Sequence, residues 1–312
     1  MRHLFCHSVY QDLDLFGEDP RATLRGIRSD GIEMLTSFDA PPAGYPDLTT
    51  TVHLPYASDW LAAWEDRPHD MPADTSLYVM YGRSRREVVS NIRRCIEAAA
   101  PMSPGHGVMH ACNADLAEVK KRTCTRDSES VIRAFCEMMN EVASGFPEGE
   151  PPFKIVFENL WWPGMRLVDG SDFDLVDELI SFDNWGICLD TGHLMNCLPG
   201  IYTEQDGIEA VTRIVSGYSR RLRDSISAVH FHFSASGQYR ETFQEEELHG
   251  DPSEFYWSAY RHVSTLDQHR AYSDPSCVRI IDILSPDYVI HELPGKESGP
   301  FHDFVQQRSL FQ

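Results

Sequence analysis

The sequence predicts a single (β/α)8 barrel, and two observations lead to this class. Short apolar or β-branched runs alternate with amphipathic segments along the 312 residues, which is typical of parallel strands joined by helices. Several later runs end in a carboxylate or an imidazole, and a barrel gathers the ends of its strands at one rim. One barrel takes about 250 residues before insertions. No break in composition divides the chain, so we predict one domain over residues 1–312.

Each predicted strand is an apolar or β-branched run bounded by polar residues, glycine or proline. The predicted strands cover residues 3–10, 31–37, 50–56, 106–112, 153–160, 185–190, 226–233 and 287–293. A loop rich in proline and glycine at residues 41–46 precedes the third strand. A long loop with Trp60 and Trp64 follows it, and a polar loop over residues 238–250 follows the seventh strand.

Helical segments fill the intervals between the strands. They are predicted at residues 19–29, 84–100, 127–144, 174–181, 206–222, 252–266, 275–284 and 300–308. Pro20 suits the first turn of its helix, where no backbone donor is needed. Ser84 and Glu87 fit a capping box at the start of the second helix. In the third, Val131 and Phe135 belong to one apolar face.

Charge and composition restrict the partners of the protein. The formal net charge of −21 repels polyanions, which argues against nucleic acid as a partner and favours a small-molecule substrate. No run approaches the ~20 apolar residues of a membrane span, and the N-terminus lacks the apolar core of a signal peptide. The eight cysteines are scattered without a Cys-x-x-Cys pair. We therefore expect a cytoplasmic protein with reduced thiols and no membrane partner.

Strand parity selects candidate ligands, because successive side chains of a strand point to opposite faces. In four predicted strands the bulky apolar residues occupy one parity and a polar residue near the strand end occupies the other. These polar residues are Glu158, Asp190, His230 and Glu292. The same test adds His53 and His110, whereas His291 has the outward parity. We expect the selected side chains to meet at the carboxyl-terminal rim of the barrel, where barrel enzymes carry their chemistry.

Several short motifs at these strand ends carry a family resemblance. They are His53-Leu54-Pro55-Tyr56, Glu158-Asn159, Leu189-Asp190-Thr191-Gly192-His193, Val229-His230-Phe231-His232 and His291-Glu292-Leu293-Pro294. In this order the chain resembles the xylose isomerase-like barrels, which include sugar isomerases and epimerases and the endonuclease IV group. Each motif is weak by itself, and together they indicate the superfamily rather than one reaction.

The resemblance to the epimerases implies one divalent metal ion bound by Glu158, Asp190, His230 and Glu292. Such a ligand set suits Mn²⁺, Mg²⁺, Co²⁺ or Zn²⁺ without choosing among them. Glu158 and Glu292 match the acid/base pair that moves a proton next to the carbonyl of a small sugar or sugar-like hydroxyketone. His193 matches a residue that holds a substrate hydroxyl. An isomerase or epimerase is therefore the first functional hypothesis.

The resemblance to the endonuclease IV group implies a fuller site and a second hypothesis. That group has extra histidines that match His53 and His110, and an acidic-x-His pair that Glu247-Leu248-His249 could supply. With His193, these residues imply two or three metal ions and a hydrolase or another polymetal enzyme. The chain departs from the group in having Glu at 247, and an acidic run is more often a solvated loop.

Substrate contacts are expected from residues near the same rim. His193 and His232 lie next to ligand candidates, Trp161 follows the strand of Glu158, and Arg240 could recognise a phosphate. The aromatic loop at residues 60–64 could cover the pocket of a neighbouring copy in a homo-oligomer. A barrel that only binds a ligand, without catalysis, is the third alternative.

Overall fold

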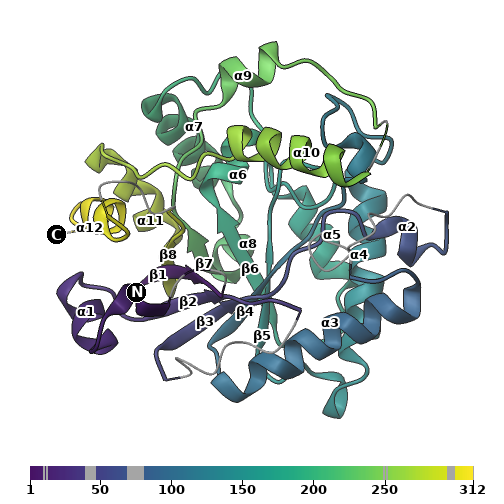
Figure 1. The fold of residues 1–312 in the computed structure, drawn as a ribbon, viewed down its shortest axis with the longest axis horizontal. Coiled ribbons are helices and arrows are strands. Elements are labelled where there is room, and N and C mark those ends of the chain that lie inside the picture. The colour runs from purple at the N-terminus through teal and green to yellow at the C-terminus, as the bar shows by residue number, and fades with distance from the viewer. Residues whose placement is uncertain are drawn as a thin grey trace.

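Eight parallel strands close into a barrel in the computed structural model (Figure 1). The structure describes residues 1–9, 11, 13–38, 47–68, 81–248, 250, 252–293 and 299–311. The strands are β1 (Arg2–Ser8), β2 (Ile32–Leu35), β3 (Thr49–His53), β4 (His106–His110), β5 (Lys154–Glu158), β6 (Trp185–Asp190), β7 (Ile226–His230) and β8 (Tyr288–His291). Each strand pairs with its sequence neighbour, and β8 pairs with β1. The predicted fold class is confirmed.

Helices surround this barrel and follow most of the strands (Figure 1). The α-helices are α1 (Pro20–Gly26), α2 (Leu61–Trp64), α3 (Arg85–Ala99), α4 (Ser128–Ala143), α5 (Ser171–Leu179), α6 (Thr191–Asn196), α7 (Glu204–Gly217), α8 (Arg220–Ser225), α9 (Gly237–Thr242), α10 (Pro252–Leu266), α11 (Val278–Leu284) and α12 (His302–Arg308). Short 3-10 turns lie at Leu13–Phe16, Ala100–Met102, Leu116–Glu118, Pro147–Gly149 and Pro275–Cys277. None of the helices in these described ranges is long and apolar enough to cross a membrane.

Side-chain caps explain where several helices begin. The Ser84 hydroxyl accepts a hydrogen bond from the Glu87 amide at the start of α3, as its sequence predicts. The helix predicted over residues 206–222 is wrong as one element, because it is two helices. The backbone is extended at Tyr218, and Ser219 then caps α8. The predicted loops also contain the short helices α2 and α9, which sequence periodicity cannot resolve at this length.

Strand parity divides the interior into two layers. Residues of outward parity, such as Ile155 and Phe157, pack in a large core between the barrel and its helices. Residues of inward parity, such as Val108, Val156 and Ile290, form a small apolar cluster inside the barrel. The polar residues at the strand ends have the same inward parity, so the candidate site lies directly next to this apolar cluster inside the barrel.

Strand register brings the polar ends side by side. His110 is the register partner of Glu158, and Asp190 is the register partner of His230. Neighbouring strands lie about 4.8 Å apart, so side chains of equal parity at paired positions can bind the same metal ion. Tyr10, Pro294 and the predicted loop at residues 41–46 lie outside the described residues.

Candidate metal centre

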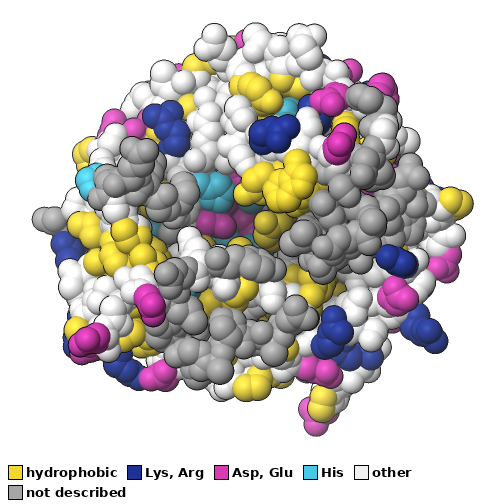
Figure 2. All heavy atoms as spheres, viewed as in Figure 1, with side chains coloured by type: hydrophobic (Ala, Val, Ile, Leu, Met, Phe, Trp, Pro, Cys, Tyr) yellow, Lys and Arg dark blue, Asp and Glu magenta, His cyan; other side chains and the backbone are white. Residues whose placement is uncertain are grey.

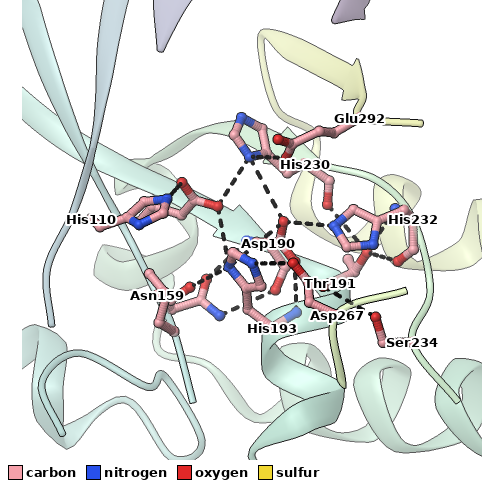
Figure 3. A network of polar contacts seen from close by, with 12 residues as sticks. His110, Asn159, Asp190, Thr191, His193, His230, His232, Ser234, Asp267 and Glu292 are labelled. Atoms are coloured by element: carbon pink, nitrogen blue, oxygen red, sulfur yellow. Dashed lines mark hydrogen bonds and ion pairs between the residues drawn. The ribbon is translucent and has the colours of Figure 1, made fainter. Parts of the chain in front are cut away.

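A four-ligand group of Glu158, Asp190, His230 and Glu292 lies at the ends of β5, β6 and β7 and directly after β8. Figure 3 labels Asp190, His230 and Glu292 of this group. His230 Nδ1 is 3.0 Å from Glu158 Oε1, 3.1 Å from Glu292 Oε2 and 3.7 Å from Asp190 Oδ2. Glu158, Asp190 and His230 are fully buried, whereas 22% of the Glu292 side chain is exposed. Carboxylate and imidazole side chains are visible at the bottom of a hollow on this face (Figure 2).

A histidine-pair group adjoins it through the other oxygen of Glu158. Its members are His53, His110 and Glu158, whose ligand atoms lie within 4.8 Å of one another. His53 Nε2 and His110 Nε2 are each 3.2 Å from Glu158 Oε2. Oε1 of the same carboxylate contacts His230, so Glu158 could contribute one oxygen to each of two cations if both groups held a metal.

An outer group consists of His193, Asp267 and His269. Asp267 Oδ2 is 3.1 Å from His193 Nε2 and 2.6 Å from His269 Nε2. The chain returns to the rim after α10, where Phe233 and Arg270 form an antiparallel bridge with hydrogen bonds of 2.9 and 3.0 Å. This bridge places Asp267 and His269 beside the end of β7. The groups thus form a continuous polar cluster across the barrel mouth.

Hydrogen bonds to backbone oxygens set the tautomers of three histidines. Nδ1 of His53 donates to Leu54 O at 2.7 Å, Nδ1 of His193 to Asn159 O at 2.9 Å, and Nδ1 of His269 to Glu292 O at 2.9 Å. A neutral ring then turns an Nε2 lone pair toward a carboxylate oxygen, which is repulsive unless a proton or a cation lies between them. This donor arrangement is the one that metal-binding histidines adopt, so the residues fit divalent cations.

Glu33 of β2 orients His230 in the same way from inside the barrel. Its carboxylate is fully buried, and Oε1 accepts a hydrogen bond of 2.8 Å from His230 Nε2. Oε2 accepts one of 2.9 Å from Thr51 Oγ1 and lies 3.4 Å from His106 Nε2. Burial opposes ionisation of Glu33, but the neighbouring His230 and His106 outweigh it and bring its pKa to about 2.

The site concentrates negative charge, which raises the pKa of some of its imidazoles when no metal is bound. Burial would lower the pKa of His193, but the charges of Asp190 and Asp267 raise it well above its usual value. Asp267 and Glu292 likewise overcome burial and raise the pKa of His269 to about 10. These two histidines are therefore protonated in the absence of metal, and metal cations compete with the protons for the same nitrogen atoms.

A family model described as "Xylose isomerase-like TIM barrel" matches residues 45–263. The chain belongs to the xylose isomerase-like TIM barrel family. The match includes most of the residues gathered at the rim, and the closed eight-stranded barrel agrees with it. No match was found among curated proteins.

Solved structures with this fold include several enzymes at low sequence identity. Endonuclease IV from Thermus thermophilus is 12% identical with a TM-score of 0.52, covering 100% of this chain and 99% of its own. The 3-keto-D-glucoside 4-epimerase from E. coli is 13% identical with a TM-score of 0.52, covering 99% and 98%. Mannonate dehydratase from Streptococcus suis is 10% identical with a TM-score of 0.54, covering 100% and 91%. These likenesses support the fold.

The structure brings together most residues that the sequence singled out. Glu158, Asp190, His230, Glu292, His53, His110 and His193 all contribute atoms to the groups above. His232 also lies in the network: its Nε2 is 2.8 Å from Asp190 Oδ2, and its ring stacks on His269 at 4.0 Å. His291 has the outward parity expected of it and contacts His3.

Only the first residue of the expected acidic-x-His pair at residues 247–249 can be placed. The Glu247 side chain is 83% exposed and forms an ion pair with Lys121, and His249 lies outside the described residues. Asp267-Gln268-His269 instead places an acidic residue and a histidine at the rim. The sequence contained that signal, and its acidic residue is the Asp that the chain lacks at position 247. Only the return of the chain after α10 shows that it lies at the rim.

Sequence reasoning also missed Glu33. The signal was present, because a glutamate flanked by Ile32 and Met34 in an apolar strand is seldom buried without a partner. Of the remaining expected contacts, the Trp161 ring lies 5.2 Å from that of His193. Trp161 and Arg240 line a common cavity of about 480 Å³ next to the metal centre.

Proposed function

We propose that this protein is a polynuclear metal enzyme that hydrolyses a small phosphate ester. The observation that carries the proposal is the division of the Glu158 carboxylate: Oε1 faces His230 at 3.0 Å, and Oε2 faces both His53 and His110 at 3.2 Å. His193 Nδ1, 3.3 Å from Oε1, joins the outer group to the same carboxylate. A mononuclear site needs only the four-ligand group, and the other imidazoles would then contact substrate rather than metal.

The protein's own residues hold the reacting groups in place. Bound divalent cations would polarise a substrate oxygen and lower the pKa of a water molecule. Asn159 fixes the backbone beside Asp190, because its amide donates to Asp190 O at 3.1 Å and accepts from Asp190 N at 2.8 Å. Glu292 is the most exposed of the four carboxylates in the groups, and the neighbouring His230 and His269 overcome burial and lower its pKa, which keeps it ionised.

The charge of the molecule favours a small substrate over a nucleic acid. A net charge of −21 repels a polyanionic chain, and repulsion of this kind weakens with salt but does not reverse. A small ester can enter the hollow without bringing a long stretch of phosphates near the acidic surface.

Isomerisation or epimerisation of a hydroxyketone is the second candidate. One observation favours it: Glu158 Oε1 and Glu292 Oε2 approach His230 Nδ1 at 3.0 and 3.1 Å, so both glutamates adjoin one cation position. They could pass a proton between neighbouring carbons of a bound sugar. This reaction requires the four-ligand group but neither His53 nor Asp267.

Metal content separates the two candidates. Elemental analysis of the purified full chain should give roughly two or three divalent ions per chain for the hydrolase and about one for the isomerase. The double substitutions His53→Gln/His110→Gln and Asp267→Asn/His269→Gln should each remove about one ion and abolish turnover of p-nitrophenyl phosphate. His302→Gln, an exposed histidine on α12, is the matched control. About one ion in wild type, unchanged by either double substitution, would overturn the proposal.

A further inference from the structure

A cavity of about 480 Å³ adjoins the candidate metal centre through Trp161, whose ring lies 5.2 Å from that of His193. Five lysine and arginine side chains line it against two acidic ones, Asp127 and Glu241. Trp161, Trp162, Arg166, Asn196 and Arg240 are among its lining residues. Lysine and arginine side chains are visible near the hollow that exposes the site carboxylates (Figure 2). A basic cavity beside an acidic metal centre is unexpected in a chain with a net charge of −21, and it indicates an anionic ligand.

Two arginines of this cavity have no carboxylate partner. Among the described residues neither Arg166 nor Arg240 forms a salt bridge, whereas Arg85 and Arg133 each pair with a glutamate. Arg166 Nη2 donates to Cys197 O at 3.4 Å, and Arg240 Nη1 donates to Leu198 O. Burial, with the neighbouring charge of Arg166, lowers the pKa of Arg240. Two positive charges thus lie close together without a salt bridge, although Glu241 and Asp127 also line the cavity.

Unpartnered donors on the same walls give a second, independent indication. Asn196 is 2% exposed, and its Nδ2 has no hydrogen-bond partner although its Oδ1 accepts from Ser236 Oγ at 2.6 Å. Nε of Arg166 and Nε1 of Trp161 are also buried without a partner. All three atoms are N–H donors on residues that line the cavity, and only an acceptor could satisfy them. Guanidinium groups with additional N–H donors are the usual surroundings of an oxyanion.

Helix α6 and one aromatic ring contribute to both the cavity and the candidate metal centre. His193 and Asn196 stand three residues apart, so they lie on the same face of α6, about one helical turn or 5 Å along its axis. The Trp161 ring contacts His193 and also lines the cavity. We propose that this cavity binds an oxyanion of the substrate, a phosphate or a carboxylate, about one helical turn from the reacting bond. This assignment rests on the proposed function, since it names the class of substrate for the same site.

Calorimetric titration of the metal-loaded full chain with inorganic phosphate tests the assignment. Arg166→Gln, Arg240→Gln and their combination should weaken phosphate binding at least about tenfold, because each removes a charge-assisted hydrogen-bond donor. Asn196→Asp, which places a carboxylate on the same wall without a change in shape, should weaken it similarly and serves if the arginine variants fold poorly. Arg213→Gln, an exposed arginine of α7, is the matched control.

Acetate and malonate in parallel titrations distinguish a sugar acid from a phosphorylated substrate. Arginine-dependent binding of phosphate alone identifies a phosphate, and arginine-dependent binding of the carboxylates identifies a carboxylate. Equal binding of every anion by wild type and all cavity variants would overturn the proposal, since the anions would then bind only at the metal ions. Metal content is measured separately. If the chain binds one ion and anion binding still depends on the arginines, the hydrolase proposal is contradicted and the anion-binding cavity is retained.

Discussion

At the scale of single residues, the feature that most distinguishes this site is a carboxylate beneath it. Glu33 lies fully buried inside the barrel and holds His230 Nε2 at 2.8 Å, while Thr51 donates to its other oxygen. A carboxylate in this position fixes the tautomer of the imidazole and makes Nδ1 a stronger ligand. Glu33 touches no substrate, so it is a positioning residue.

Replacement of Glu33 by glutamine tests this role. The amide keeps the shape and can still accept from His230, but it removes the negative charge that raises the basicity of the ring. We expect the affinity for the ion at the four-ligand group to fall about 10- to 100-fold, as measured by competition with a metal chelator. Glu209→Gln, an exposed glutamate on α7, should leave the affinity unchanged. Unaltered affinity in Glu33→Gln would show that the contact is only structural.

At the scale of elements, the turn from β6 to α6 performs two tasks with one aspartate. Asp190 Oδ1 caps α6 by accepting from the His193 amide at 2.6 Å, and Oδ2 faces the metal centre and His232. The helix therefore begins where the ligand is presented, which fixes His193 relative to Asp190. Gly192 lies between them, and a Cβ at this position would collide with the His232 ring.

Gly192→Ala should therefore disturb the site through packing alone. The added methyl group must move the His232 ring away from Asp190 and from its stack on His269. We expect about 1–3 kcal/mol of lost stability in chemical denaturation and a loss of metal from the outer group. The matched control is Gly217→Ala at the end of α7, where a Cβ would meet no atom within 4 Å. Equal metal content in the two variants would contradict this account.

At the scale of the whole molecule, the candidate metal centre gathers residues from strands that are distant along the chain. Ligand candidates come from the ends of β3 to β7, from Glu292 directly after β8 and from the segment after α10. Without cations, the carboxylates of this cluster are balanced only by protons on histidines such as His269, whose pKa is raised to about 10. That protonation stabilises the metal-free fold below pH 6.5 and is lost as the pH rises through about 10.

Chelation of metal should accordingly lower the melting temperature, and the decrease should grow with pH. At about pH 6 protons replace part of the missing positive charge, whereas at about pH 8.5 the cations bind with less competition and contribute more. Each displaced proton should raise metal affinity about tenfold per pH unit below the pKa of its group. Thermal unfolding with and without chelator at both pH values measures the effect. A decrease that shrinks with rising pH would contradict the assignment of these histidines as ligands.

Much of the metal centre could be predicted because strand periodicity is a local property. Alternation in β5, β6 and β7 assigned Glu158, Asp190 and His230 to the inward face, and the structure buries all three there. Capping at Ser84 was equally local. The break between α7 and α8 was missed because apolar spacing continues from Val215 to Leu222 across it, and only Ser219 marks the new helix start.

The sequence by itself determined the barrel and the inward polar ends of its strands, because side-chain alternation and the alternation of strands with helices are written along the chain. Tertiary structure decided the rest. It placed Asp267 and His269 beside β7 through the path of the chain after α10, whereas the Glu247 side chain is exposed and pairs with Lys121. It also set Glu33 under His230, far away along the chain, and left Arg166 and Arg240 without carboxylate partners among the described residues. Contacts between distant segments depend on how the closed barrel brings them together, and no local pattern encodes them.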